Sequence, residues 1–315
     1  MEKFSQFRDR GSGVSPFIPV TTPSTTISAL PRVFVFLLRF IPFIAYAAVY
    51  FLFLQFLPLP AAVRKILLWA LMGIPGIWWV DLQIDGVKRG HLSQQPASRV
   101  PHPGSVIAAS FTSPVDAIYL AAIFDPIFTV SFPGTRNVRQ ISLLQAVAQA
   151  LSPVQLGLPQ ASLRDGSVTD ISALLKAHPD RIIVVFPECS TTNGKGVLPF
   201  SPSLLATPST ASIFPVSLRY TPPDITTPIP GAWAAFLWKL LSRPTHCIRV
   251  RIAEGVSNTA GGLGEGESTL APEEQNMLDR IAESLARLGR NKRVGLTLAE
   301  KAAFVKAWTN PKKNH

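Results

Sequence analysis

The spacing of apolar positions divides this chain of 315 residues into three stretches. Residues 1–28 are rich in Ser, Thr, Pro and Gly and have no apolar period, which predicts a disordered N-terminus. An uncharged run then extends from Phe40 to Val63, and a helix of about 20 such residues crosses a bilayer. From Asp81 onward, short apolar runs alternate with helical patterns, which predicts an α/β domain with a largely parallel sheet.

A second apolar run, Ile66–Val80, follows the first after the basic pair Arg64 and Lys65. Two arrangements fit. In one, Phe40–Leu57 crosses the membrane once and the second run lies in the headgroup region. In the other, the two runs form a hairpin. Basic residues flank the first run on both sides, so charge does not choose between them. We therefore assign residues 29–80 to one or two membrane-embedded segments.

The stretch 81–254 contains the predicted α/β domain. Residues 255–271 are rich in Gly, Glu and Ser, which is typical of a flexible loop. Residues 272–315 are expected to form two helices and a basic tail.

Composition narrows the class of protein. Charged residues make up 16% of the chain, whereas soluble domains carry about a quarter. The net charge of +11 favours binding to a polyanionic surface, either a nucleic acid or an anionic membrane. Because no nucleic-acid-binding pattern is present, an anionic membrane is the expected partner. Two cysteines provide neither a disulfide framework nor a metal-binding cluster.

Three polar clusters fall where predicted strands end. They are Ser110–Asp116, the segment after Phe186 that begins with Glu188, and Arg164 with Asp165. Ligands of α/β sheets bind at the carboxyl ends of strands, and arginine suits a phosphate oxyanion. A basic pocket next to a membrane segment therefore suggests a lipid that carries a phosphate.

These clusters resemble the sequence blocks of the PlsC-type glycerolipid acyltransferase family. The matching blocks are SFTSPVDAIYL, ASLRD, FPECSTTNGKGVLPF and FPVSLRY, in the family's order. The nearest resemblance is to fungal lysophosphatidic acid acyltransferases that use oleoyl-CoA. It implies a glycerol-3-phosphate acyltransferase-like domain that acylates a lysophospholipid, most directly lysophosphatidic acid to phosphatidic acid. It also implies acyl-CoA as co-substrate without a further cofactor or metal, and a cytosol-facing site on endoplasmic reticulum or lipid droplets.

The resemblance also assigns roles to residues. Asp116 and Glu188 take the catalytic positions, although Asp116 also fits a helix cap. Arg164 takes the phosphate-binding position, with Arg139 as a second candidate. The pocket for the acceptor is expected to be lined by Thr191, Thr192, Asn193 and Gly194.

The sequence departs from the family at its general base. The family's histidine is replaced by Phe111, which cannot accept a proton, and the motif's glycine is Cys189. Three hypotheses remain: an active acyltransferase with another base, a catalytically silent lipid-binding membrane adaptor, and a thiol hydrolase that uses Cys189.

Overall fold

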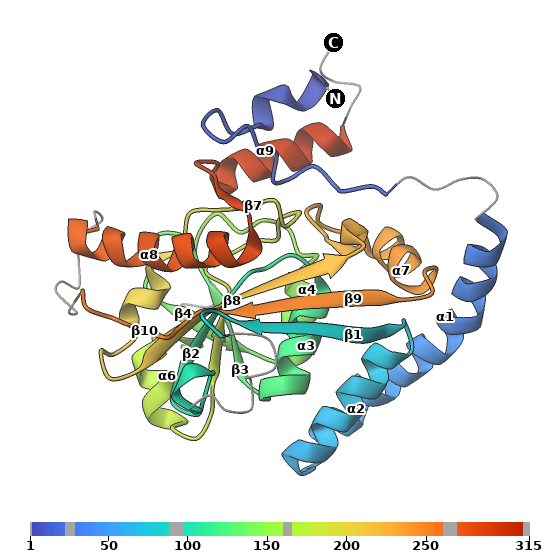
Figure 1. The fold of residues 1–315 in the computed structure, drawn as a ribbon, viewed down its shortest axis with the longest axis horizontal. Helices are drawn as coiled ribbons and strands as arrows, with labels where there is room; N and C mark the ends of the chain where they lie inside the picture. Colours follow the sequence, from blue (N-terminus) through green and yellow to red (C-terminus); the bar gives the residue numbers. More distant parts are fainter. Residues whose placement is uncertain (1, 23–28, 88–96, 160–165, 261–269, 311–315) are drawn as a thin grey trace.

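A computed structural model describes residues 2–22, 29–87, 97–159, 166–260 and 270–310 (Figure 1). A sheet with the strand order β1-β9-β8-β2-β6-β3-β4-β5 forms the centre, and β10 pairs with β8. The strands are β1 Ile77–Ile84, β2 Val106–Ala109, β3 Ile127–Ser131, β4 Val138–Ile141, β5 Val168–Thr169, β6 Ile183–Val185, β7 Gly196–Val197, β8 Ser212–Thr221, β9 His246–Ile252, β10 Val256–Ser257 and β11 Lys292–Arg293. The α-helices are α1 Ala29–Leu52, α2 Ala61–Gly73, α3 Pro114–Phe124, α4 Leu143–Gln149, α6 Ile171–Ala177, α7 Trp233–Leu241, α8 Pro272–Gly289 and α9 Leu298–Thr309.

The four central strands, β8, β2, β6 and β3, are parallel. The prediction of an α/β fold with a largely parallel sheet is therefore confirmed for the centre of the domain. Antiparallel pairs flank it, because β9 runs against β8 and β4 runs against β3. The carboxyl ends of the central strands meet at one edge, where α/β proteins bind their ligands.

Both faces of this sheet are buried, as expected for parallel strands. Ile107 and Ala109 of β2 face the core that includes α3, α4 and α7. Val106 and Ala108 of the same strand face the core that includes α6 and α8. Figure 1 shows α8 and α3 on opposite sides of the strands.

The apolar N-terminal region is helical over a different range from the one predicted. One helix in the described part of the chain, Leu30–Phe56, is long and apolar enough to cross a membrane. The second run is not one membrane segment, since α2 ends at Gly73 and β1 begins at Ile77. The predicted boundary after Val80 therefore lies inside a strand. Gly76 explains the turn, because it has φ +86° and a Cβ there would lie 2.4 Å from the carbonyl oxygen of Pro244.

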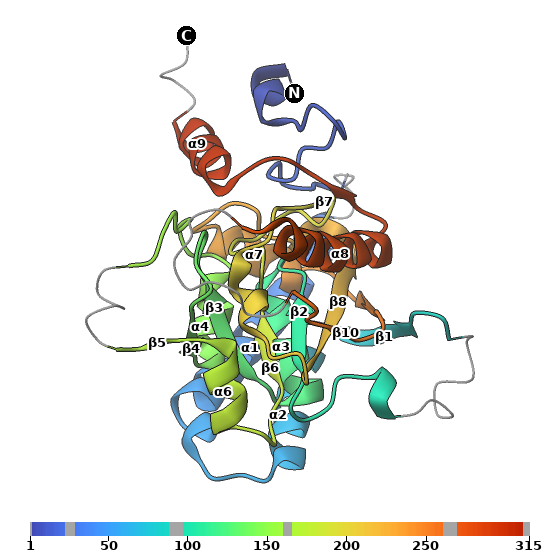
Figure 2. The same ribbon diagram turned by 90° about the vertical axis from the view of Figure 1, so that its left-hand side faces the viewer.

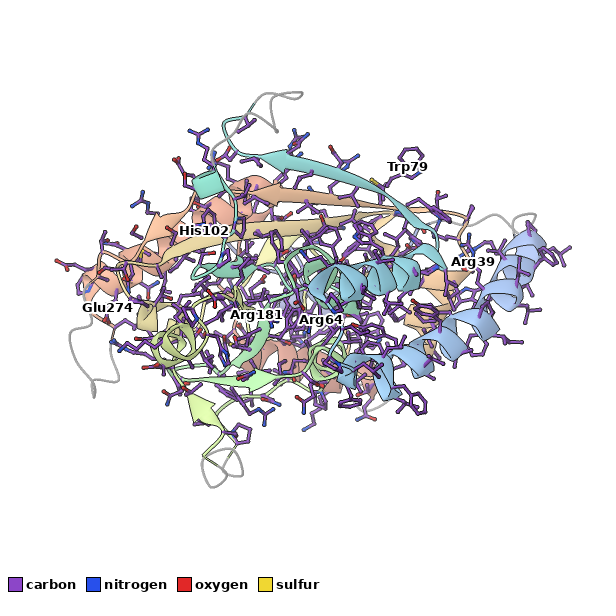
Figure 3. The ribbon with its side chains drawn as sticks, turned by 90° about the horizontal axis from the view of Figure 1, so that it is seen from below. Arg39, Arg64, Trp79, His102, Arg181 and Glu274 are labelled. Atoms are coloured by element: carbon purple, nitrogen blue, oxygen red, sulfur yellow. The ribbon has the colours of Figure 1, made fainter. Side chains whose placement is uncertain are left out.

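Two tryptophans of that run lie on the sheet's edge strand rather than on a membrane helix. The pairing of β1 with β9 is irregular between Ile77 and Trp79, and Trp78 lies at the irregularity. Trp78 and Trp79 are 66% and 68% exposed, and Trp79 projects outward in Figure 3. A bulge re-aims side chains, which explains why adjacent tryptophans are both exposed.

Arg39 fixes α1 against the domain. Its guanidinium donates hydrogen bonds to the carbonyl oxygens of Pro75 (3.1 Å), Arg243 (2.5 Å) and Pro244 (2.9 Å). The opposite side of α1 exposes apolar side chains, among them Leu30, Phe34, Leu37, Leu38 and Ile41. Arg39 thus lies on the side of α1 that packs against the domain, and the exposed side of the helix is apolar.

The prediction of disorder is wrong for residues 2–22. This segment packs beside α9 at the top of Figures 1 and 2. Phe7 and Phe17 contact Phe304 of α9, with ring centroids 5.3 and 5.9 Å apart. Widely spaced phenylalanines have no helical or strand period, so the pattern of apolar positions did not reveal them as anchors.

The predicted flexible loop is also partly structured. β10 pairs with β8, and Asn258 donates hydrogen bonds to the carbonyl oxygens of Leu205 (2.9 Å) and Thr207 (2.8 Å). Residues 261–269 lie outside the described residues. In the basic linker between the two C-terminal helices, β11 pairs with β7.

Replacing Phe304 by Ala is expected to lower the free energy of unfolding by about 3–5 kcal/mol, because this side chain is fully buried among aromatic rings. Chemical denaturation of the full chain in detergent measures the loss. Lys306→Ala, at an exposed position of the same helix, serves as the control and is expected to cost less. Equal small losses in both variants contradict the packing of residues 2–22 on α9.

Candidate functional site

Two carboxyl groups meet where β2 and β6 end. The backbone N–H of Phe111 bonds to Glu188, and the backbone N–H of Thr112 donates to Asp116 Oδ2 at 2.6 Å. Asp116 is near enough for its charge to raise the pKa of Glu188. Adjacent backbone groups after β2 therefore hold both predicted catalytic carboxyls.

Asp116 is fully buried and saturated with donors. Its Oδ2 accepts hydrogen bonds from the N–H groups of Thr112 and Ser113, and its Oδ1 accepts one from the Tyr220 hydroxyl. Burial raises the pKa of Asp116 to about 6, against these hydrogen bonds, which lower it. Asp116 also closes the capping box that starts α3 with Ser113. The helix-cap role is therefore present in the structure.

Phe111 fills the position of the family's histidine with an apolar ring. It is 1% exposed and stacks on Phe186, with ring centroids 4.4 Å apart. Its carbonyl oxygen accepts the N–H of Thr192 at 3.0 Å. The ring is thus a core element that joins the ends of β2 and β6.

Glu188 is 2% exposed, and its Oε2 accepts the N–H of Leu198 at 3.0 Å. Burial raises the pKa of Glu188 to about 8, against the N–H groups of Leu198 and Phe111 and the charge of Lys301, which lower it. A carboxyl whose pKa lies near the working pH suits general acid–base chemistry.

Lys301 of α9 is the site residue that sequence reasoning missed. It is fully buried, and its Nζ donates to Ser190 Oγ (2.7 Å), to the carbonyl oxygen of Thr191 and to Thr191 Oγ1 (3.3 Å). Burial lowers the pKa of Lys301 to about 7, while the charge of Glu188 raises it. The only signal in the sequence was a lysine within the apolar stretch LTLAEKAAF, because buried lysines are rare.

The predicted pocket residues after Glu188 make internal hydrogen bonds. Thr191 Oγ1 donates to Thr227 O (2.6 Å), and Gly194 N donates to Thr192 Oγ1 (3.4 Å). Asn193 Nδ2 donates to the carbonyl oxygens of Ser15 (2.7 Å) and Ile18 (2.8 Å). These contacts join the motif loop to the N-terminal segment. Binding of the acceptor by Thr191, Thr192, Asn193 and Gly194 stays a prediction.

The structure describes one of the two arginines that are predicted to bind phosphate. Arg164 lies outside the described residues. Arg139 lies on β4, two strands away from β6 in the sheet. Arg139 is thus separated by one intervening strand from the strand that leads to Glu188, and phosphate binding by Arg164 stays a prediction.

None of the histidines in the described part of the chain replaces the missing base. His102 precedes β2, at the opposite edge of the sheet from Asp116, and His178 ends α6. His246 contacts the carbonyl oxygen of Leu240 at 2.8 Å. His91 and His315 lie outside the described residues.

Cys189 occupies a position that favours glycine. Its φ is +56°, in the left-handed region that side chains with a Cβ seldom adopt. Burial raises the pKa of the thiol to about 12. A thiol is a weak nucleophile unless it ionises, so this environment weakens the thiol hydrolase hypothesis.

Two cavities lie near the loops that hold the carboxyls, although neither is lined by Asp116 or Glu188. One of about 240 Å³ has almost entirely apolar walls, which include Pro114 and Val115 of α3, Phe43 of α1 and Phe236 of α7. The other, of about 340 Å³, is lined by Cys189, Leu198 and residues at the start of α9. In the described part of the chain, no group of three or more His, Cys, Asp or Glu is placed to hold a metal ion.

Two curated fungal proteins are similar to this chain. A Schizosaccharomyces pombe protein, described as an inferred lysophosphatidic acid:oleoyl-CoA acyltransferase, is 26% identical over 325 aligned residues, which cover 98% of both chains. Lysophosphatidic acid:oleoyl-CoA acyltransferase 1 of Saccharomyces cerevisiae is 25% identical over 203 residues, or 64% of this chain and 61% of that protein. No family model and no solved structure matches the chain. The resemblance to fungal acyltransferases that the motifs predicted is thus confirmed.

Tyr220→Phe is expected to lower the free energy of unfolding by about 1–3 kcal/mol, because Asp116 Oδ1 loses its hydrogen bond in a buried site. Thermal and chemical denaturation measure the change. Tyr119→Phe is the matched control, since Tyr119 is equally buried in the same core but donates no bond to Asp116. A Tyr220→Phe loss no larger than that of Tyr119→Phe contradicts the assigned bond.

Proposed function

We propose that this protein is an acyl-CoA-dependent acyltransferase that acylates a lysophospholipid, with lysophosphatidic acid and oleoyl-CoA as its substrates. One observation carries the proposal: Asp116 and Glu188, from two separate motifs, meet in one buried cluster at the carboxyl end of the sheet. The similarity of the whole chain to a fungal protein with that described activity supports the choice of substrates.

Glu188 is the proposed general base. The acceptor hydroxyl attacks the thioester carbonyl, an ester C–O bond forms and the C–S bond breaks. Glu188 takes the hydroxyl proton and returns it to the departing thiolate of CoA. Its pKa of about 8 makes the carboxylate a stronger base than an ordinary glutamate. Asp116 is saturated with hydrogen bonds, so it holds the loop after β2 in place.

One cavity and one sequence block suit the two ends of the substrates. The apolar cavity between α1, α3 and α7 would take the acyl chain. Arg164, within the ASLRD block, is the proposed phosphate ligand. The exposed apolar side of α1 would seat the protein on the cytosolic surface of endoplasmic reticulum or lipid droplets.

A silent lipid-binding adaptor is the alternative, and Phe111 is the observation that favours it. Its ring is buried against Phe186 where the family places a base, and Glu188 is itself 2% exposed. An adaptor would bind the same lipids without turning them over.

Wild-type protein in microsomes is expected to form labelled phosphatidic acid from labelled oleoyl-CoA and lysophosphatidic acid. Glu188→Gln is expected to reduce the rate by about 100-fold or more, because general base catalysis is lost. The control, Glu274→Gln, removes a buried carboxyl of α8 that pairs with Arg136. Equal rates for wild type and Glu188→Gln would remove Glu188 from the mechanism. No product from wild type with any lysophospholipid supports the adaptor.

The rate is expected to rise as the pH increases through about 8, since Glu188 acts only when ionised. Glu188→Gln is expected to lose this rise together with most of the rate, because glutamine has no proton to release in this range. Glu274→Gln is the control and is expected to keep the wild-type midpoint. A rise through about pH 8 that persists in Glu188→Gln contradicts the assignment of Glu188 as the base.

A further inference from the structure

A cavity of about 580 Å³ lies at the carboxyl end of α3, away from the motif cluster. Asp125, which caps this end of α3, lines the cavity, whereas Asp116 lies in the first turn of the same helix. Nine residues of helix separate these two aspartates by roughly 14 Å. The volume falls within the range of roughly 300–1,000 Å³ that is typical of sites for small molecules.

The walls of this cavity are amphipathic. Apolar side chains come from several elements: Phe56, Leu68, Phe128, Ile141 and Leu144. The polar side chains of the lining include Arg64, Asp125, Gln140, His178 and Arg181. Such a division suits a ligand with one apolar and one polar end.

The polar wall carries a surplus of positive charge. Arg64 Nη2 donates to Asp125 Oδ2 at 2.5 Å. Arg181 Nη2 donates to the carbonyl oxygen of Asp125 at 2.7 Å and lies 3.6 Å from its Oδ1. Two guanidinium groups thus share one carboxylate, and Figure 3 shows Arg181 beside Arg64 of α2.

Both guanidinium groups remain within reach of a ligand. The side chains of Arg64 and Arg181 are 31% and 39% exposed, and both line the cavity. The guanidinium fork matches the oxygens of a carboxylate or phosphate. An anionic head in the cavity can therefore pair with the two arginines alongside Asp125.

The cavity also adjoins the apolar surface of the N-terminal helices. Its lining includes Tyr50 near the end of α1 and Arg64 and Leu68 of α2. Phe56 and Ile66, in the same region, are 75% and 66% exposed. An amphiphile that leaves a membrane surface in contact with these helices can therefore reach the cavity.

We propose that this cavity binds a single-chain lipid with an anionic head, held by Arg64 and Arg181, with its chain along Leu68 and Leu144. A free fatty acid and a lysophosphatidate share this chemistry. The site is separate from the cluster of Asp116 and Glu188 and does not require that acyl transfer occurs.

Photocrosslinking to the full chain in detergent, without acyl-CoA, tests the site. Three probes with the same photoreactive oleoyl chain are compared: oleate, oleoyl lysophosphatidate and neutral monooleoylglycerol. Mass spectrometry locates the labelled peptides. Oleate, lysophosphatidate or both are expected to label α2 and α4, and the one that does so identifies the source of the ligand.

The double variant Arg64→Gln/Arg181→Gln is expected to lose this labelling about tenfold or more, because charge-assisted hydrogen bonds to the head are removed. Gln140→Trp, which fills the cavity without changing charge, is expected to lose it too. Arg136→Gln is the matched control, since Arg136 is also 31% exposed and paired with a carboxylate. Equal labelling by monooleoylglycerol, or full labelling in both test variants, would overturn the proposal.

Discussion

Burial of ionisable groups at the carboxyl end of the sheet is the constraint on which the rest of the site depends. Asp116, Glu188 and Lys301 all lie within the protein interior, where a charge is stable only with partners. The backbone N–H groups of residues 111–113, the hydroxyl of Tyr220 and the loop after Glu188 supply those partners. Removing any one of these partners leaves a buried polar group without its hydrogen bond. The loops around the cluster are therefore held in one arrangement.

The two ends of the chain complete this arrangement. Lys301 reaches the motif loop from α9, and Asn193 of that loop binds the N-terminal segment through the carbonyl oxygens of Ser15 and Ile18. Phe304 packs between these parts. Residues far from the α/β core in sequence therefore help to set the electrostatics of Glu188. An acyltransferase built in this way would need both termini for activity, which distinguishes it from a domain that functions alone.

The sequence predicted the elements that have a strong local pattern. Apolar runs such as RIIVVF became β6, and the first helix after β2 begins at Pro114 with its cap at Ser113. It did not predict contacts made by scattered side chains. Phe7 and Phe17 have no period, Lys301 looks like an ordinary helix residue, and Trp78 turns outward only because of an irregular strand pairing. These features depend on contacts between residues far apart in the chain, which a local sequence pattern does not reveal.

Catalysis without a histidine base is the central claim, and a histidine-free full chain tests it most directly. All five histidines would be replaced by Gln, including His91 and His315, and formation of phosphatidic acid from oleoyl-CoA and lysophosphatidic acid would be measured. If Glu188 takes the proton, the variant keeps most of the wild-type rate. Loss of activity in a folded, lipid-binding variant, restored by returning a single histidine, would contradict the claim.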